Sequence, residues 1–172
     1  MAAIKTVGES QGWFYLLPAR PSNPEAITLT ELAAGIEGTW DAAASGTRFS
    51  FTASDTMSDA AYGDSSNSTI TTRSNYEGSI APFIKLDDTT GAYAALSNDL
   101  FEAVREKGSP CYVVSGITGD PTEARAAGDL YDYFEYTTDD GQKPTEVGGY
   151  MKRQVPLHPA GYSRGAKALV TA

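Results

Sequence analysis

The stretch GDLYDYFEYTTDDG, residues 128–141, is a run of aromatic and β-forming residues with turn-forming residues at both ends. If residues 129–138 are extended, successive side chains point to opposite faces of the strand. The two faces carry, respectively, Leu130, Asp132, Phe134 and Tyr136, and Asp129, Tyr131, Tyr133 and Glu135. Each face mixes rings with acids, so neither is a plain core face. We expect parts of both faces to be covered by other copies of the chain after assembly.

The chain length bounds the organisation. The 172 residues suit a single domain over residues 1–172, and a domain of this size buries roughly 70% of its unfolded surface without help from a metal or disulfide. The single cysteine, Cys111, excludes an internal disulfide and a thiol metal cluster. It lies in the apolar run CYVVSGI, where we expect a buried strand residue rather than a reactive nucleophile.

The net charge restricts the partners. With 22 acids against 13 bases, the charge of −9 argues against a surface that grips nucleic acid from outside. No apolar run reaches the roughly 20 residues of a membrane span, and the N-terminus does not resemble a signal peptide. We therefore expect a soluble, unprocessed chain that makes no membrane contact.

The charge is unevenly distributed. Residues 147–172 carry four bases and no acid, whereas the rest of the chain is acidic. One interpretation is a solvated face followed by a basic tail. The other is that the basic C-terminal segment docks on an acidic surface of its own or a neighbouring copy.

Eight segments have the composition of strands bounded by Gly, Pro or Asp. They are residues 12–19, 47–54, 69–75, 78–86, 110–117, 129–138, 148–158 and 166–172. Between the second and third lies a small, polar, acidic stretch over residues 54–69, the composition of a long exposed loop. These segments predict a hairpin with an unusually long tip.

Two helices interrupt the strands. In TLTELAAG, Thr28 and Glu31 have the spacing of a capping box, and Gly35 suits a left-handed helix end. Residues 91–108 carry apolar side chains at helical spacing up to Gly108, which predicts a longer amphipathic helix. One flanking amphipathic helix, a short N-terminal helix and many strands indicate an α+β, mainly β fold: a β-sandwich or partial barrel.

The sequence carries no catalytic signature. There is no G-x-S-x-G elbow, no Walker loop and no G-x-G-x-x-G. His158 lies between prolines in PLHPAG, where a turn or strand end is favoured over a general base. Arg164 and Lys167 in GYSRGAK could contact a phosphate, but two bases in a basic segment support this weakly. We expect no enzyme activity and no cofactor.

The acidic clusters are more typical of turns than of catalytic or metal-binding sites. Pairs of acids next to turn-forming residues occur at Asp87 with Asp88 and at Asp139 with Asp140. Asp55, Asp59 and Asp64 are too sparsely spaced for a known calcium loop. Whether this loop binds an ion stays open.

The order of the elements resembles the major tail protein, or tail tube subunit, of long-tailed bacteriophages. The segments that carry the resemblance are AITLTELAAGIEGTWD (26–41), the hairpin (47–75), NYEGSIAPFIKLDD (75–88) before the amphipathic helix, and RAAGDLYDYFEY (125–136). They span most of the chain, and the match is one of arrangement rather than of a sharp motif.

The resemblance implies a β-sandwich flanked by a helix, six of which close into a ring, and rings that stack into a hollow tube for DNA ejection. Partners would be the chain itself and the tape measure, tail terminator and tail tip proteins. The protein would reside in the virion tail and assemble in the host cytoplasm. On this basis the strands near 47–54, 69–75, 110–117 and 129–138 line the bore. Loop residues Asp55, Asp59, Tyr62 and Asp64 would reach the adjacent ring.

A bore that passes DNA should not attract it. DNA carries one negative charge per roughly 1.7 Å of axis and binds basic surfaces through counterion release. The expected lumen-facing residues are Asp129, Asp132, Glu135, Ser50, Thr52 and Thr71, although strand alternation separates Asp132 from Asp129 and Glu135. Arg48 and Arg73 do not fit such a lining, because their positive charges would attract DNA. The basic residues expected at subunit contacts are Lys152, Arg153, Arg164 and Lys167.

Other classes of protein share some of these features. Ten tyrosines against six phenylalanines supply rings suited to surfaces that are partly dry and partly wet. A monomeric β-sandwich module that binds carbohydrate or another surface would use them too, as would a virion connector or decoration protein. An enzyme with two carboxylates in a cleft is a further alternative.

Overall fold

The computed structural model describes residues 12–58, 69–71, 74–143 and 149–171. The strands are β1 Phe14–Leu17, β2 Ile36–Glu37, β3 Arg48–Thr52, β4 Thr56–Ser58, β5 Thr69–Thr71, β6 Asn75–Ile80, β7 Pro110–Gly116, β8 Leu130–Thr138 and β9 Val155–Ala168. The α-helices are α1 Leu29–Ala33 and α2 Asp99–Val104, and single 3-10 turns lie at Ala44–Gly46 and Ala95–Ser97.

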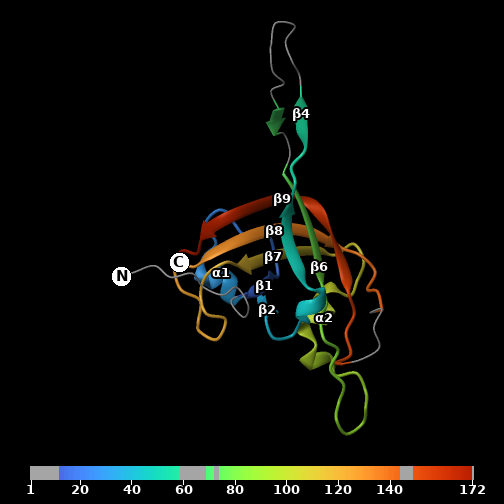
Figure 1. The fold of residues 1–172 in the computed structure, drawn as a ribbon. Helices are drawn as coiled ribbons and strands as arrows, with labels where there is room; N and C mark the ends of the chain where they lie inside the picture. The colour runs from blue at the N-terminus through green and yellow to red at the C-terminus, as the bar shows by residue number, and fades with distance from the viewer. Residues whose placement is uncertain (1–11, 59–68, 72–73, 144–148, 172) are drawn as a thin grey trace, which may run out of the picture.

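Seven strands form one antiparallel sheet in the order β2-β1-β7-β8-β9-β6-β3, and β4 and β5 form a separate ribbon. The sheet is strongly curved, so that β6 and β3 cross over one face of its central strands (Figure 1). It does not close into a barrel. The predicted α+β, mainly β class is confirmed.

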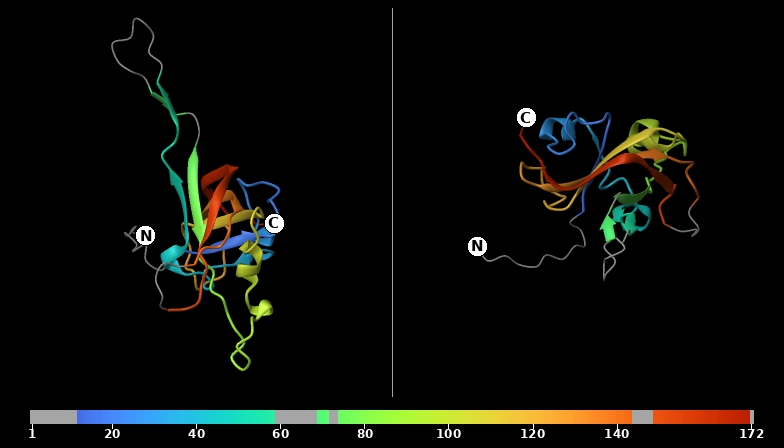
Figure 2. Two further views of the ribbon diagram at one scale, coloured as in Figure 1. Left: turned by 90° about the vertical axis from the view of Figure 1, so that its right-hand side faces the viewer. Right: turned by 90° about the horizontal axis from the view of Figure 1, so that it is seen from above.

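The central strand β8 is buried on both faces within one chain. Its four aromatic side chains are at most 1% exposed: Tyr131, Tyr133, Phe134 and Tyr136. Phe49 from β3 and Tyr76 from β6 pack against one face, and Ile27 and Leu32 against the other. Figure 2, from above, shows α1 on one side of the central strands and β3 and β6 on the other. The expectation that other copies cover these faces was wrong for the rings, because the chain covers them itself.

Helix α1 begins as the sequence predicts. The Thr28 hydroxyl accepts from the Glu31 amide at 3.1 Å, and the Glu31 carboxylate accepts from the Thr28 amide at 3.0 Å, so the capping box is confirmed. Gly35 is not left-handed. Its backbone instead lies so close to β1 that an added Cβ would be 2.8 Å from the Leu16 carbonyl oxygen. Glycine is needed there for close packing.

The helix predicted over residues 91–108 is much shorter, since α2 has only six residues. The buried carboxamide of Asn98 accounts for the break. It accepts from the Lys85 amide at 2.7 Å and donates to the carbonyls of Lys85 and Ala94 at 2.8 and 2.7 Å. These bonds hold the chain ahead of α2 against a neighbouring loop. Gly108, predicted to end the helix, lies instead in the turn before β7, with φ of +84°.

Strand β9 replaces the two C-terminal strands predicted at residues 148–158 and 166–172. It is one strand of 14 residues that bends at Gly161 and Ala166, with φ of +106° and +50°. His158, predicted to occupy a turn or strand end, lies inside β9 and pairs with Thr137 of β8. One register shift against β8, between Phe134 and Tyr136, lies next to Pro159, and an irregularity of this kind accommodates a proline within a strand.

The hairpin predicted between residues 47–54 and 69–75 is present with a different pairing. β3 pairs with β6, and β4 pairs with β5 further out. We call the β4–β5 ribbon and its connections, residues 53–74, the arm; its described part projects from one end of the body in Figures 1 and 2. Residues 59–68 and 72–73 lie outside the described residues.

Candidate assembly surfaces

The face of β3 and β6 that points away from the core is polar and open. Because Phe49 and Phe51 pack inward, Ser50 and Thr52 point outward by strand alternation. The Arg48 guanidinium lies 3.1 Å from the Glu77 carboxylate on the adjacent strand. Such an exposed pair adds little stability, but it gives the cation a partner in its own chain.

In the described part of the chain, two strand edges are open on the β3 side of the sheet. β3 is the last strand of the sheet. β6 pairs with β9 only over Val155–Leu157, so the rest of β9 has β8 alone as a neighbour. A groove of about 560 Å³ separates the two strands beyond that point, with Tyr76, Pro159 and Tyr162 among its lining residues. Open edges of this kind offer backbone N–H and C=O groups to a further strand.

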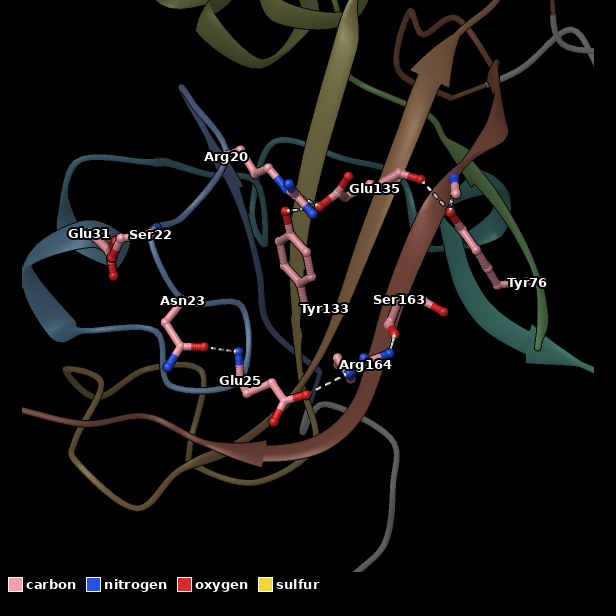
Figure 3. Close-up of polar contacts among 11 residues, drawn as sticks. Arg20, Ser22, Asn23, Glu25, Glu31, Tyr76, Tyr133, Glu135, Ser163 and Arg164 are labelled. Carbon is pink, nitrogen blue, oxygen red and sulfur yellow. Dashed lines mark hydrogen bonds and ion pairs between the residues drawn. The ribbon is translucent and has the colours of Figure 1, made fainter. Parts of the chain in front are cut away.

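Glu135, expected to face the lumen, is buried and paired inside the chain. Its carboxylate lies 2.7 Å from the Arg20 Nε and accepts from the Tyr133 hydroxyl at 3.1 Å (Figure 3). Burial, and then the neighbouring carboxylate, raise the pKa of Tyr133 well above its usual range, so the hydroxyl remains a donor. Through this ion pair, Glu135 of β8 holds in place the segment that contains Arg20.

This segment, residues 18–28, links β1 to α1, and we call it the strap. Its second fastening is Glu25, whose carboxylate lies 2.8 Å from Arg164 and 3.6 Å from Lys167 of β9 (Figure 3). The pKa of Glu25 is lowered, mainly by the hydrogen bond from Arg164. Two of the four bases expected at subunit contacts thus have an acidic partner in their own chain.

Lys152 and Arg153, the other two bases, have no such partner in the part of the chain that the structure describes. Lys152 donates to the Ser45 hydroxyl at 3.1 Å. Among the described residues, no carboxylate lies within ion-pair distance of Lys152 or Arg153. Their charges remain available at the surface, at the end of the body opposite the arm.

The remaining predicted residues fall into three groups. Asp129 accepts from the Ala126 amide at 2.9 Å in the turn before β8, and Asp132 accepts from the Ala166 amide at 2.9 Å, which holds the bend in β9. Asp55 is exposed at the base of the arm and accepts from the Asn75 side chain at 2.8 Å. Thr71 contributes its backbone to β5. Asp59, Tyr62, Asp64 and Arg73 lie outside the described residues.

The hydrogen bonds between Glu31 and the strap predict that the stability of the fold depends on pH. The Glu31 carboxylate accepts from the amides of Thr28 and Ser22 at 3.0 Å each, and these bonds lower its pKa from 4.5 to about 2. A depressed folded-state pKa adds stability that is present above the unfolded value and is lost as pH falls through the folded value. We expect Glu31→Gln to cost on the order of 1 kcal/mol at neutral pH.

That difference should shrink as the pH falls from about 5 to about 2. Urea unfolding of both chains at several pH values measures it. A difference that stays constant over this range would contradict the role given to the carboxylate.

The described residues contain no arrangement typical of catalysis or metal binding. No group of three or more His, Cys, Asp or Glu side chains in this part could hold a metal ion. The His158 Nε2 lies 3.0 Å from the Asp139 carboxylate on an exposed surface. Cys111 is 2% exposed, as predicted for a packed strand residue, and this burial raises the pKa of its thiol to about 12. No helix in the described ranges has the length and hydropathy of a membrane span.

Comparison with known proteins decides between the classes left open by the sequence. A family model described as "Phage tail tube protein" matches residues 1–172. The chain belongs to the phage tail tube protein family. The predicted resemblance is thereby confirmed, and the protein is a structural component of a phage tail. No curated protein matches the chain.

Sequence reasoning missed the residues that join separate segments within this tail tube subunit. Arg20, Glu25 and Asn98 were not singled out, although each fixes a segment far from it in sequence. The prolines of PARPSNPE, residues 18–25, indicate an extended, non-helical segment. Nothing local identifies β8 and β9 as the strands to which that segment is fastened.

Proposed function

We propose that this tail tube protein assembles into hexameric rings that stack into the tube through which phage DNA is ejected. The observation that supports this best is the curved, unclosed sheet, with an open edge at β3 and a second along β9. Strand pairing between neighbouring copies would satisfy both edges and close a continuous wall. The arm would contact the adjacent ring.

We assign the wall of the bore to the outward face of β3 and β6, with Ser50 and Thr52 as lining residues and Thr71 further out on β5. This face suits the task because its one described cation, Arg48, is paired with Glu77. Glu135, Asp129 and Asp132 contribute less, since Glu135 is 8% exposed and the carboxylates of the other two accept from backbone amides. DNA would pass without specific binding.

The protein would act in the virion tail after assembly in the host cytoplasm, together with tape measure, tail terminator and tail tip proteins. The purified chain provides the direct test. Mass measurement should detect species of six copies, and negative-stain images at high protein concentration should show tubes with a central channel. Monomers under all conditions would refute the proposal, and so would rings that never stack.

The unpaired bases give a sharper prediction. We expect the double variant Lys152→Glu with Arg153→Glu to fold but to lose most tube formation, because two acids would then oppose the acidic surface of the next copy. The matched control is Arg164→Glu, whose charge is already engaged by Glu25; it should lower stability rather than assembly alone. Circular dichroism checks the fold and electron microscopy the tubes. Unimpaired tubes in the double variant would remove this contact.

A further inference from the structure

The end of the body opposite the arm exposes an unusual number of large apolar side chains. They are Trp40, Leu86, Tyr93, Leu96, Tyr150 and Met151, with exposed fractions of 62%, 45%, 40%, 97%, 83% and 55%. We call this set the apolar end. Single exposed apolar residues are ordinary, whereas a group of them marks a surface that another molecule covers.

Backbone contacts join these residues into one surface. The Phe83 amide donates to the Asp41 carbonyl at 2.9 Å, and the Ile84 amide donates to the Met151 carbonyl at 2.8 Å. The segments around Trp40, Leu86 and Tyr150 therefore lie side by side. Leu86 in turn bridges to Tyr93, three residues before Leu96. In Figures 1 and 2 the loop over residues 86–93 projects away from the arm.

The surface is held in shape before anything binds it. The Asp87 carboxylate accepts from the Thr90 amide at 2.7 Å, and Asn98 clamps the base of the loop with its three hydrogen bonds. The Tyr150 ring packs edge-on against Phe83, with centroids 5.6 Å apart. A surface ordered in advance loses less conformational freedom on docking.

The charged residues near the apolar end indicate which surface covers it. Lys152 and Arg153 follow Met151 directly and carry no ion pair among the described residues. The arm, residues 53–74 at the other end of the body, has three acids and one base in its sequence. Lys152 and Arg153, at one side of the apolar end, are thus opposite in charge to the arm, and the exposed acids Asp87 and Asp88 lie in the loop at its other side.

We propose that the apolar end is the surface on which the arm-bearing end of the next copy along the tube docks. The inference rests on the function proposed above and adds the receiving surface to it. Because the two contacting surfaces are different, the contact is heterologous and repeats without closing. Stacking would then give every subunit the same direction and the tube two distinguishable ends.

The test replaces Leu96, which is almost fully exposed and contributes little to the fold. We expect Leu96→Asp to raise the critical concentration for tube growth on the order of tenfold or more, with an unchanged melting temperature. Ala127→Asp places the same charge on an exposed turn outside the apolar end, and it should assemble as the unmodified chain does. Sedimentation and electron microscopy measure both.

A second readout identifies the contact. A photo-reactive benzophenone side chain at position 96 should cross-link, within assembled tubes, to peptides from residues 48–75 of another copy. Cross-links between two apolar ends, or undiminished assembly of Leu96→Asp in conditions where the unmodified chain forms tubes, would overturn the docking surface alone. An unmodified chain that never forms tubes would overturn the proposed function as well.

Discussion

Replacing Phe134 by alanine is expected to destabilise the fold by about 3–5 kcal/mol, a large part of the roughly 5–15 kcal/mol that holds a domain together. Phe134 lies on the central strand β8 and is fully buried. Its ring contacts Phe51, Tyr76 and Tyr136, with centroids 4.8, 5.8 and 5.7 Å apart. Its loss would open a cavity where β8 supports β3 and β6, the strands that carry the arm.

The matched control is Phe51→Ala, which removes a ring of the same size from the other side of that contact. Phe51 is 38% exposed, so its loss should cost less than about 2 kcal/mol. Urea denaturation with a cooperative transition measures both values. Equal costs for the two variants would contradict the view that the core under the arm is centred on β8.

The second large effect concerns the proposed wall of the bore. Converting Ser50 and Thr52 to lysine should change a lining that does not bind DNA into one that does. Each subunit of the proposed ring would gain two lysines that can contact DNA phosphates. Each contact should steepen the dependence of the logarithm of the DNA association constant on the logarithm of the salt concentration by about one. We therefore expect salt-sensitive retention of duplex DNA by tubes of the double variant and none by tubes of the unmodified chain.

Co-sedimentation of a labelled duplex with preformed tubes, between low and physiological salt, measures this retention. Thr122→Lys with Ala127→Lys is the control, because both residues are exposed in the loop before β8 rather than on β3. Equal DNA retention by the two lysine variants would show that the outward face of β3 does not line the channel.

Local rules predicted much of the architecture. The class, the long hairpin, the capping box at Thr28 and the strand at Leu130–Thr138 follow from composition, turn chemistry and side-chain alternation. These features depend on residues within a few positions of one another, which is why the sequence shows them. The family resemblance rested on the same ordered segments, and the match over residues 1–172 agrees with it.

The errors arose where distant contacts outweigh local preference. The apolar spacing of residues 91–108 favours a helix, yet Asn98 satisfies three backbone groups of the neighbouring loop instead. The prolines around His158 favour a turn, yet β8 supplies a partner along the length of β9. Free energy gained from pairing and burial exceeded the smaller propensity terms in both cases.

The amino-acid sequence by itself determined that this chain is a mainly β tail tube protein with an acidic hairpin tip and a basic C-terminal segment. Only the tertiary structure decided which charges are available to other copies. Glu135 is tied to Arg20, and Arg164 to Glu25, across more than one hundred residues, whereas Lys152 and Arg153 form no ion pair with any described residue. The reason is physical: a charge becomes a binding group only when folding leaves it unpaired and exposed, and pairing over such separations is set by how the strands pack.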